Sequence, residues 1–132
     1  MFLNVTAHEL TTEQRELAAS YSDTIVDLKK LNPSLHERLV SCPLEKGELL
    51  ALADELLMFI GEVSQMNKNR LTLHLPIGSP AFMALFFMKL DREKLPCRIV
   101  FSHSDRVSVD EKQEDGSVVK RAVFKFVKFI EI

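Results

Sequence analysis

The sequence predicts an α/β protein, a Rossmann-like three-layer sandwich with a parallel central sheet and a C-terminal β-hairpin. Up to residue 101, short apolar and β-branched runs alternate with segments of helical periodicity. The remaining residues alternate Val and Phe with charged side chains around one turn sequence, which is typical of an antiparallel hairpin. The length of 132 residues suits one domain, so we expect a single domain over residues 1–132.

The first 28 residues indicate strand, helix, strand. Phe2 to Thr6 is a short apolar run that predicts a buried strand. Thr11 can cap a following helix, and Gln14, three residues later, completes a capping box. Thr24 to Leu28 is β-branched and apolar, so it predicts a second strand.

Two helices are predicted next. A short one starts near Pro33, because proline is favoured at the first helical position, and it stops at Cys42–Pro43. From Glu45 to about Gln65, apolar residues recur at three- and four-residue steps and give the strongest helix of the sequence. We expect the break at residues 67–69.

A strand–helix–strand unit and the hairpin complete the chain. Leu71 to Leu75 is a third strand, and Ser79–Pro80 starts a helix through Met88 that is apolar on nearly every side and should be largely buried. Cys97 to Phe101 is a fourth strand. For the hairpin we expect an alternating segment at residues 106–110, a turn at 114–117 and a long strand at 118–130.

Charge and composition exclude several classes of protein. A net charge of −2 with a pI near 6.1 argues against binding of long duplex nucleic acid, which usually requires a basic excess. Cys42 and Cys97 form no paired motif, which fits a reducing compartment. The sequence contains no signal peptide and no apolar run long enough for a membrane span, so we expect a soluble, cytoplasmic protein without membrane contact.

Three expected loops leave the carboxyl ends of parallel strands, where open α/β sheets bind their ligands. They are residues 6–9, 77–79 and 102–106, and they are rich in small, hydroxyl and imidazole side chains. If they converge on one crevice, they suit a phosphorylated ligand. The candidate ligand-binding residues are Thr6, Ala7, Gly78, Ser79, Ser102, Ser104 and Arg106.

Gly78–Ser79 gives the clearest phosphate signal. Glycine lets a ligand approach the backbone, Ser79 supplies a hydroxyl, and a helix start presents free N–H groups in a positive field. An ordinary strand-to-helix turn has the same local sequence. The lysine of a Walker loop and the spacing of a dinucleotide motif are both missing, which argues against an NTPase or a dinucleotide enzyme.

Histidine and arginine supply the other candidates. His8 can donate to a phosphate or transfer protons near neutral pH; the alternative is a loop histidine with no task. Arg106 can clamp a phosphate, or it is a charge at the hairpin edge. His8, His74 and His103 together could bind a metal ion, but their spacing matches no compact motif, so we expect no metal and no cofactor.

Two stretches resemble a known family. The start of the chain, with the pattern His8-x-Leu10-Thr11-x-x-Gln14, resembles the opening of small single-domain CARF proteins from type III CRISPR systems. Residues 115–129 resemble the C-terminal hairpin of stand-alone ring nucleases of that group, and Arg106 and the acidic pair at 110–111 stand where that pattern has an arginine and an acidic pair. Residues 29–70 match no family that we can name.

The resemblance implies a CARF-like fold and a homodimeric, metal-independent phosphodiesterase that switches off type III CRISPR signalling. Such an enzyme binds a cyclic oligoadenylate, here expected to be cyclic tetra-adenylate, and cuts it into linear products. The substrate's own 2′-OH attacks the adjacent phosphodiester and leaves a 2′,3′-cyclic phosphate, so the protein needs only to align that attack and stabilise the phosphorane. The implied catalytic residues are His8, Ser79 and Arg106, with His103 as a local substitute.

Three other functions remain open. The same phosphate cradle could serve a sink that binds the cyclic messenger without cutting it. It could also serve a regulatory module that senses a nucleotide and signals to a partner. The last alternative is an α/β interaction protein with no ligand.

Overall fold

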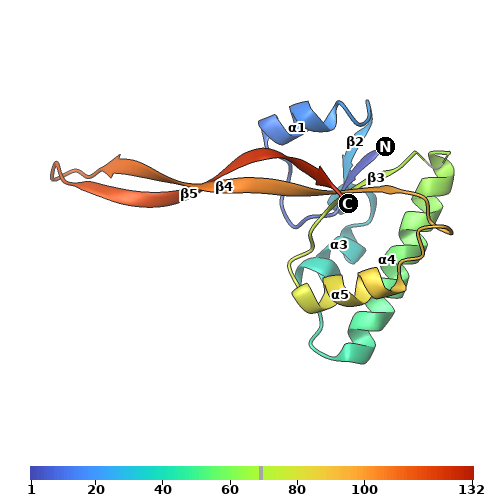
Figure 1. Ribbon diagram of the computed structural model, residues 1–132. Helices are drawn as coiled ribbons and strands as arrows, with labels where there is room; N and C mark the ends of the chain where they lie inside the picture. Colours follow the sequence, from blue (N-terminus) through green and yellow to red (C-terminus); the bar gives the residue numbers. More distant parts are fainter. Residues whose placement is uncertain (69) are drawn as a thin grey trace.

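A five-stranded sheet with helices on both faces forms the fold (Figure 1). The computed structural model describes residues 1–68 and 70–132. The strands are β1 (Phe2–Asn4), β2 (Ile25–Asp27), β3 (Thr72–Leu75), β4 (Arg98–Lys112) and β5 (Val118–Glu131). Their order is β2-β1-β3-β4-β5; the first four run parallel, and β5 is antiparallel to β4. The predicted fold class is confirmed.

The helices lie on opposite faces of the sheet. They are α1 (Thr12–Ala18), α2 (Leu28–Leu31), α3 (Pro33–Val40), α4 (Lys46–Met66) and α5 (Pro80–Lys89). Figure 1 shows α1 over one face and α3, α4 and α5 over the other. The predicted capping box of Thr11 and Gln14 is present, and Ser79 caps α5. The expected break after α4 is confirmed at Asn67 and Lys68, while Asn69 lies outside the described residues.

Alternation along the short strands divides the apolar side chains between two cores. Leu3 and Leu73 pack with the α3, α4 and α5 side, whereas Phe2 packs with Phe129 on the side of α1. All of these side chains are buried, and full burial of one Leu or Phe contributes about 1.5–3 kcal/mol relative to exposure. The two cores hold α1 and the longer helices against opposite faces.

The expectation of a loop at residues 102–106 is wrong. These residues belong to β4, which continues without interruption from Arg98 to Lys112. The reason is the antiparallel partner: β5 pairs with β4 as far as Lys112, so the backbone groups of this segment are satisfied as a strand. A register shift between His103 and Ser104 marks an irregularity of the β-bulge kind in this pairing.

Two further expectations need correction. Leu28, expected to end the second strand, is the first residue of α2, which the sequence analysis missed. The expected near-complete burial of α5 is only partly right. Phe82 and Phe86 are fully buried, but Met88 is 81% exposed, so one apolar side of α5 faces solvent.

The outer parts of β4 and β5 form a two-stranded arm that projects beyond the sheet and the helices (Figure 1). Its tip is the expected turn, where Gly116 has a φ of 86°, a conformation that glycine adopts without strain. Opposite charges face each other across the arm at Asp105–Lys125 and Asp110–Lys120. Within the described ranges, no helix has both the length and the apolar character to cross a bilayer.

Candidate functional site

The carboxyl edge of the sheet contains a topological switch point between β1 and β3. The chain leaves β1 toward β2 on one side, while β3 lies on the other side and continues to β4. Loops that diverge in this way leave a crevice between them, which is where open α/β sheets bind ligands. Residues 6–9 follow β1 and residues 76–79 follow β3, so two of the three expected loops border this point.

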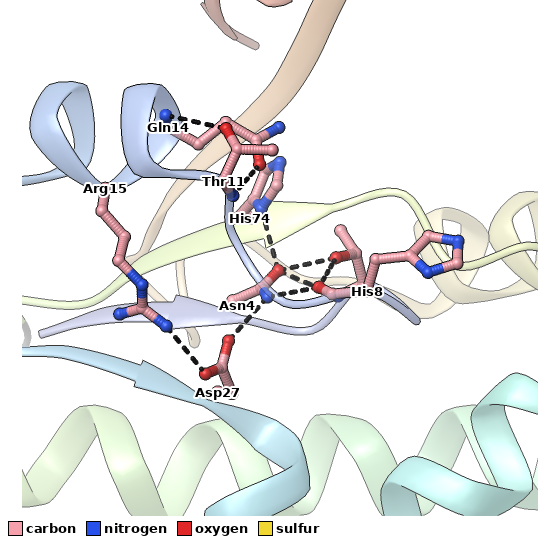
Figure 2. Close-up of polar contacts among 8 residues, drawn as sticks. Asn4, His8, Thr11, Gln14, Arg15, Asp27 and His74 are labelled. Atoms are coloured by element: carbon pink, nitrogen blue, oxygen red, sulfur yellow. Dashed lines mark hydrogen bonds and ion pairs between the residues drawn. The ribbon is translucent and has the colours of Figure 1, made fainter.

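A row of buried polar side chains crosses three neighbouring strands near the carboxyl edge of the sheet. Asn4 on β1 is in register with Asp27 on β2 and with His74 on β3. Their exposed fractions are only 1%, 5% and 2%. They face α1, whose Arg15 side chain reaches down to Asp27 (Figure 2). The Gln14 side chain of α1 donates to Ser102 on β4, which contacts His74.

Asn4 is the centre of the row, and it fixes the loop after β1. Its Nδ2 donates to the carbonyl of His8 and to Oδ1 of Asp27, both at 2.8 Å. Its Oδ1 accepts from the backbone N–H of Thr6 at 3.3 Å and lies 2.8 Å from the Thr6 hydroxyl. The amide therefore uses both of its donor hydrogens and holds the backbone of residues 6–8 in one conformation (Figure 2).

The tautomer of His74 follows from these contacts. The Nδ2 of Asn4 faces two acceptors, so its Oδ1 faces His74, and Nδ1 of His74 must carry the hydrogen across the 2.9 Å contact. Nε2 of His74 then accepts from the hydroxyl of Ser102, and Gln14 donates to that hydroxyl oxygen at 3.2 Å. Burial lowers the pKa of His74 to about 4, so the ring is neutral at physiological pH.

Asp27 is a buried carboxylate with two partners. Arg15 of α1 reaches its Oδ2 at 3.3 Å, and Asn4 donates to its Oδ1. The arginine side chain is 42% exposed, so the pair joins a buried acid to a group in contact with water. Because an unpaired buried carboxylate is costly, this pairing helps to fix α1 over the sheet.

His8 differs from these residues. The side chain is exposed and points away from Asn4 (Figure 2). Within the described residues, the imidazole makes no hydrogen bond, ion pair or ring contact, although its backbone carbonyl is held by Asn4. The residue His8 borders a small hollow of about 30 Å³ at the carboxyl edge. The hollow is lined by Asn4, Thr6, Ala7, His8, Glu9, Asp27, Lys29 and His36.

Gly78 and Ser79 start α5, as expected. The Ser79 Oγ accepts from the backbone N–H of Phe82 at 3.2 Å, so this hydroxyl has a structural task as a helix cap. Burial raises the pKa of the neighbouring Cys42 thiol, and a hydrogen bond with Ser79 opposes that rise. Gly78 has no positive φ, and an added Cβ there would meet no atom within 4 Å. Neither backbone conformation nor crowding therefore requires glycine at this position.

The candidates on β4 have different surroundings. Ser102 contacts His74 of the buried row and accepts from Gln14. His103 is exposed and lies 3.2 Å from Asp105. Ser104 borders an open groove of about 600 Å³ between α1 and the arm. Arg106 is exposed opposite Phe124 and has no ion pair in the described part of the chain.

The structure does not bring His8, His74 and His103 together as a group of metal ligands. Both ring nitrogens of His74 are engaged, by Asn4 and by Ser102. His103 lies on β4 beside Asp105, and His8 is on the loop after β1. Among residues 1–68 and 70–132, no group of three potential ligands is placed to hold a metal ion.

Several residues of this edge are not among the site residues that the sequence predicts. Asn4, Asp27 and His74 were assigned to strands, but their polarity was not used. The signal was present, because each stands at or next to the end of a strand, at the ligand-binding edge of a parallel sheet. Lys29 and His36 lie in the segment that matches no named family, and only the structure places them beside His8.

The buried His74 predicts a pH-dependent stability. An unfolded histidine binds its proton near pH 6.5, whereas folded His74 stays neutral down to about pH 4. Its contribution is complete above pH 6.5, and about 3 kcal/mol is lost as the pH falls toward 4. Urea unfolding between pH 7 and 4 measures this loss, and His74→Gln should flatten it. An equal pH dependence in both proteins would contradict the assignment.

Comparison with known proteins gives one match. The model of the Uncharacterized protein MJ1673 family matches residues 1–130. No curated protein and no solved structure matches the chain. Since the match spans nearly all of the sequence, the carboxyl-edge site described above lies within it, and the chain belongs to the Uncharacterized protein MJ1673 family.

Proposed function

We propose that the protein is a ring nuclease, which binds cyclic oligoadenylates, with cyclic tetra-adenylate as the expected substrate, and cuts them to linear products with a 2′,3′-cyclic phosphate. One observation carries the proposal. In the segment His8-x-Leu10-Thr11-x-x-Gln14, three of the four defining side chains have structural tasks and His8 has none.

The structural tasks are specific. Leu10 is buried in the core beneath α1. Thr11 and Gln14 form the capping box, and Gln14 also donates to Ser102. The imidazole of His8 is exposed at the edge where ligands bind, on a backbone that Asn4 holds in place. A fixed backbone with an uncommitted imidazole suits a group that acts on a ligand rather than on the fold.

The chemistry that we propose requires few protein groups. The 2′-OH of one adenosine attacks the adjacent phosphorus in line, so the protein supplies no nucleophile. An imidazole can orient that hydroxyl, protonate the leaving 5′-oxygen or donate to the phosphate, because it exchanges a proton near neutral pH. The proposed reaction needs no metal ion and no cofactor.

Phosphate binding is assigned, within this proposal, to three places. The N-terminus of α5, with Gly78 and Ser79, offers backbone N–H groups in a positive field, beside the Ser79 hydroxyl that caps the helix. Thr6 and Ala7 border the hollow beside His8. Arg106, exposed and without an ion pair in the described residues, can form a two-pronged contact with a phosphate.

A homodimer is part of the proposal, because a two-fold cyclic ligand suits two equivalent crevices. Exposed apolar side chains support it: Phe124 on the arm is 78% exposed and Met88 on α5 is 81% exposed. A two-stranded ribbon is marginally stable without packing on either face, so a second copy would stabilise the arm.

A sink or sensing module that binds the messenger without cutting it is the second candidate. It is favoured by the state of two residues expected to be catalytic. Ser79 accepts the capping hydrogen bond of α5, and His103 is paired with Asp105. A non-catalytic protein would keep the same phosphate contacts and would leave His8 as a donor only.

Substitution of Gly78 tests the phosphate cradle. Gly78→Val should leave the fold intact, because an added Cβ meets no atom within 4 Å, but it should block the approach of the ligand. Loss of a charged contact costs on the order of 1.5–3 kcal/mol, or about 10- to 100-fold in affinity. Calorimetry with cyclic tetra-adenylate measures the effect. Gly47→Val is the matched control, since an added Cβ there also meets no atom within 4 Å. Equal affinity in the two variants would show that Gly78 is not part of a phosphate-binding site.

Substitution of His8 tests catalysis. In EDTA, His8→Ala should slow single-turnover cleavage by roughly 100-fold and leave binding within about 10-fold, because positioned acid–base groups act mainly on the transition state. Arg106→Ala should weaken both binding and cleavage. If His8→Ala cleaves at the wild-type rate and His103→Ala cleaves more slowly, the catalytic group lies on β4 and not at His8. Loss of wild-type cleavage in EDTA would contradict a metal-independent reaction.

Light scattering tests the assembly. We expect the mass of two chains at tens of micromolar protein, and Phe124→Ser with Met88→Ser should shift the population toward one chain. Met66→Ser is a control, because this side chain is 82% exposed but lies at the end of α4. A monomer in the wild-type protein would count against a site shared by two copies.

A further inference from the structure

We infer that Lys29 and His36 complete, with His8, the group of side chains that cleaves the phosphodiester. This inference rests on the proposed function, and it names two residues that neither the sequence patterns nor the resemblance assign. The juxtaposition of His8, Lys29 and His36 around one hollow carries it.

Three separate elements bring these side chains together. His8 is on the loop after β1, Lys29 is on α2 immediately after β2, and His36 is on α3. All three line the same hollow at the carboxyl edge of the sheet. The positions are well supported, because Asn4 holds the carbonyl of His8 and the buried Leu35 anchors α3 beside His36.

The three groups are not used by the fold. Within the described ranges, none of their side chains makes a hydrogen bond or an ion pair. Two acidic residues also line the hollow. Asp27 is committed to Arg15 and Asn4, and Glu9 is exposed to solvent. Among the lining residues, Lys29, His8 and His36 are therefore the groups available to an anionic ligand.

The size of the hollow limits what can enter. About 30 Å³ accommodates an atom group such as a phosphate oxygen or a water molecule, but not a nucleobase. The bases and sugars of the ring must therefore lie outside, over the edge of the sheet. The part of the ligand presented to His8, Lys29 and His36 is the phosphodiester itself.

Cleavage by 2′-OH attack uses a base, an acid and a cation, and this set provides one of each. One neutral imidazole accepts the 2′-OH proton as the bond from O2′ to phosphorus forms. The other, protonated imidazole donates its proton to O5′ as the bond from phosphorus to O5′ breaks. Lys29 balances the negative charge of the phosphorane. The two rings end with their protonation states exchanged, and solvent restores them.

The pH profile of single-turnover cleavage tests the set, with cyclic tetra-adenylate as substrate in EDTA. In the wild type, the cleavage rate plotted against pH should be bell-shaped, with one limb of the curve from each imidazole. His8→Ala should lose one limb and His36→Asn the other, each with a rate lowered by roughly 100-fold. Lys29→Met should lower the rate and keep both limbs. Lys30→Met is the matched control, since this neighbouring lysine does not line the hollow, and it should behave as wild type.

The outcomes separate this inference from the proposed function. If the wild type cleaves and both limbs persist in His36→Asn, the inference is overturned and the ring nuclease stands. If the wild type does not cleave, the proposed function fails, and proton NMR of the imidazole rings with adenosine 3′-monophosphate decides whether the hollow takes a phosphate. If the resonances of both His8 and His36 shift, and shift less in Lys29→Met, the hollow binds a phosphate. If the resonances of both rings stay unmoved, phosphate binding by the hollow is overturned.

Discussion

The burial of a polar row across the middle of a parallel sheet is the constraint on which the rest of this structure depends. Asn4, Asp27 and His74 are nearly inaccessible to water, and a buried polar group without a partner costs about 1–3 kcal/mol. Their partners come from three other places: the loop after β1, Arg15 of α1, and Ser102 on β4, to which Gln14 of α1 also donates. Within the described residues, no buried side-chain nitrogen or oxygen lacks a partner. Satisfying the row therefore fixes α1, the loop and the start of the long hairpin relative to one another.

This constraint also explains why a site can be rigid at an edge made of loops. The backbone around His8 is held by a side chain of the sheet rather than by contacts with solvent. Asn4 is itself oriented on two sides, by the neutral ring of His74 and by the carboxylate of Asp27. A group carried on such a backbone can be exposed and still well placed, which is what acid–base chemistry on a phosphodiester requires.

Local chemistry made the fold predictable from the sequence. Thr11 with Gln14 and Ser79 with Pro80 mark helix starts by the hydrogen bonds they make, and these bonds are local. The errors lie where distant partners decide. Residues 102–106 look like a loop because they are polar, but β5 supplies their hydrogen bonds from far along the chain. In the same way, an apolar run cannot reveal that Asn4 and His74 meet in the interior, and nothing local joins Lys29 to His8.

The polar row has a consequence for how the protein forms in the cell. The row and its partners are spread from Asn4 to Ser102, so a chain emerging from the ribosome carries Asn4 and Asp27 long before Ser102 is made. Long-range pairings such as that of β1 with β3 form slowly, because loop-closure entropy must be paid before any contact rewards it. The β4–β5 arm, in contrast, pairs residues that are close in sequence. The arm therefore forms rapidly once it is made, whereas His74 gains its Ser102 partner only when β4 pairs with β3.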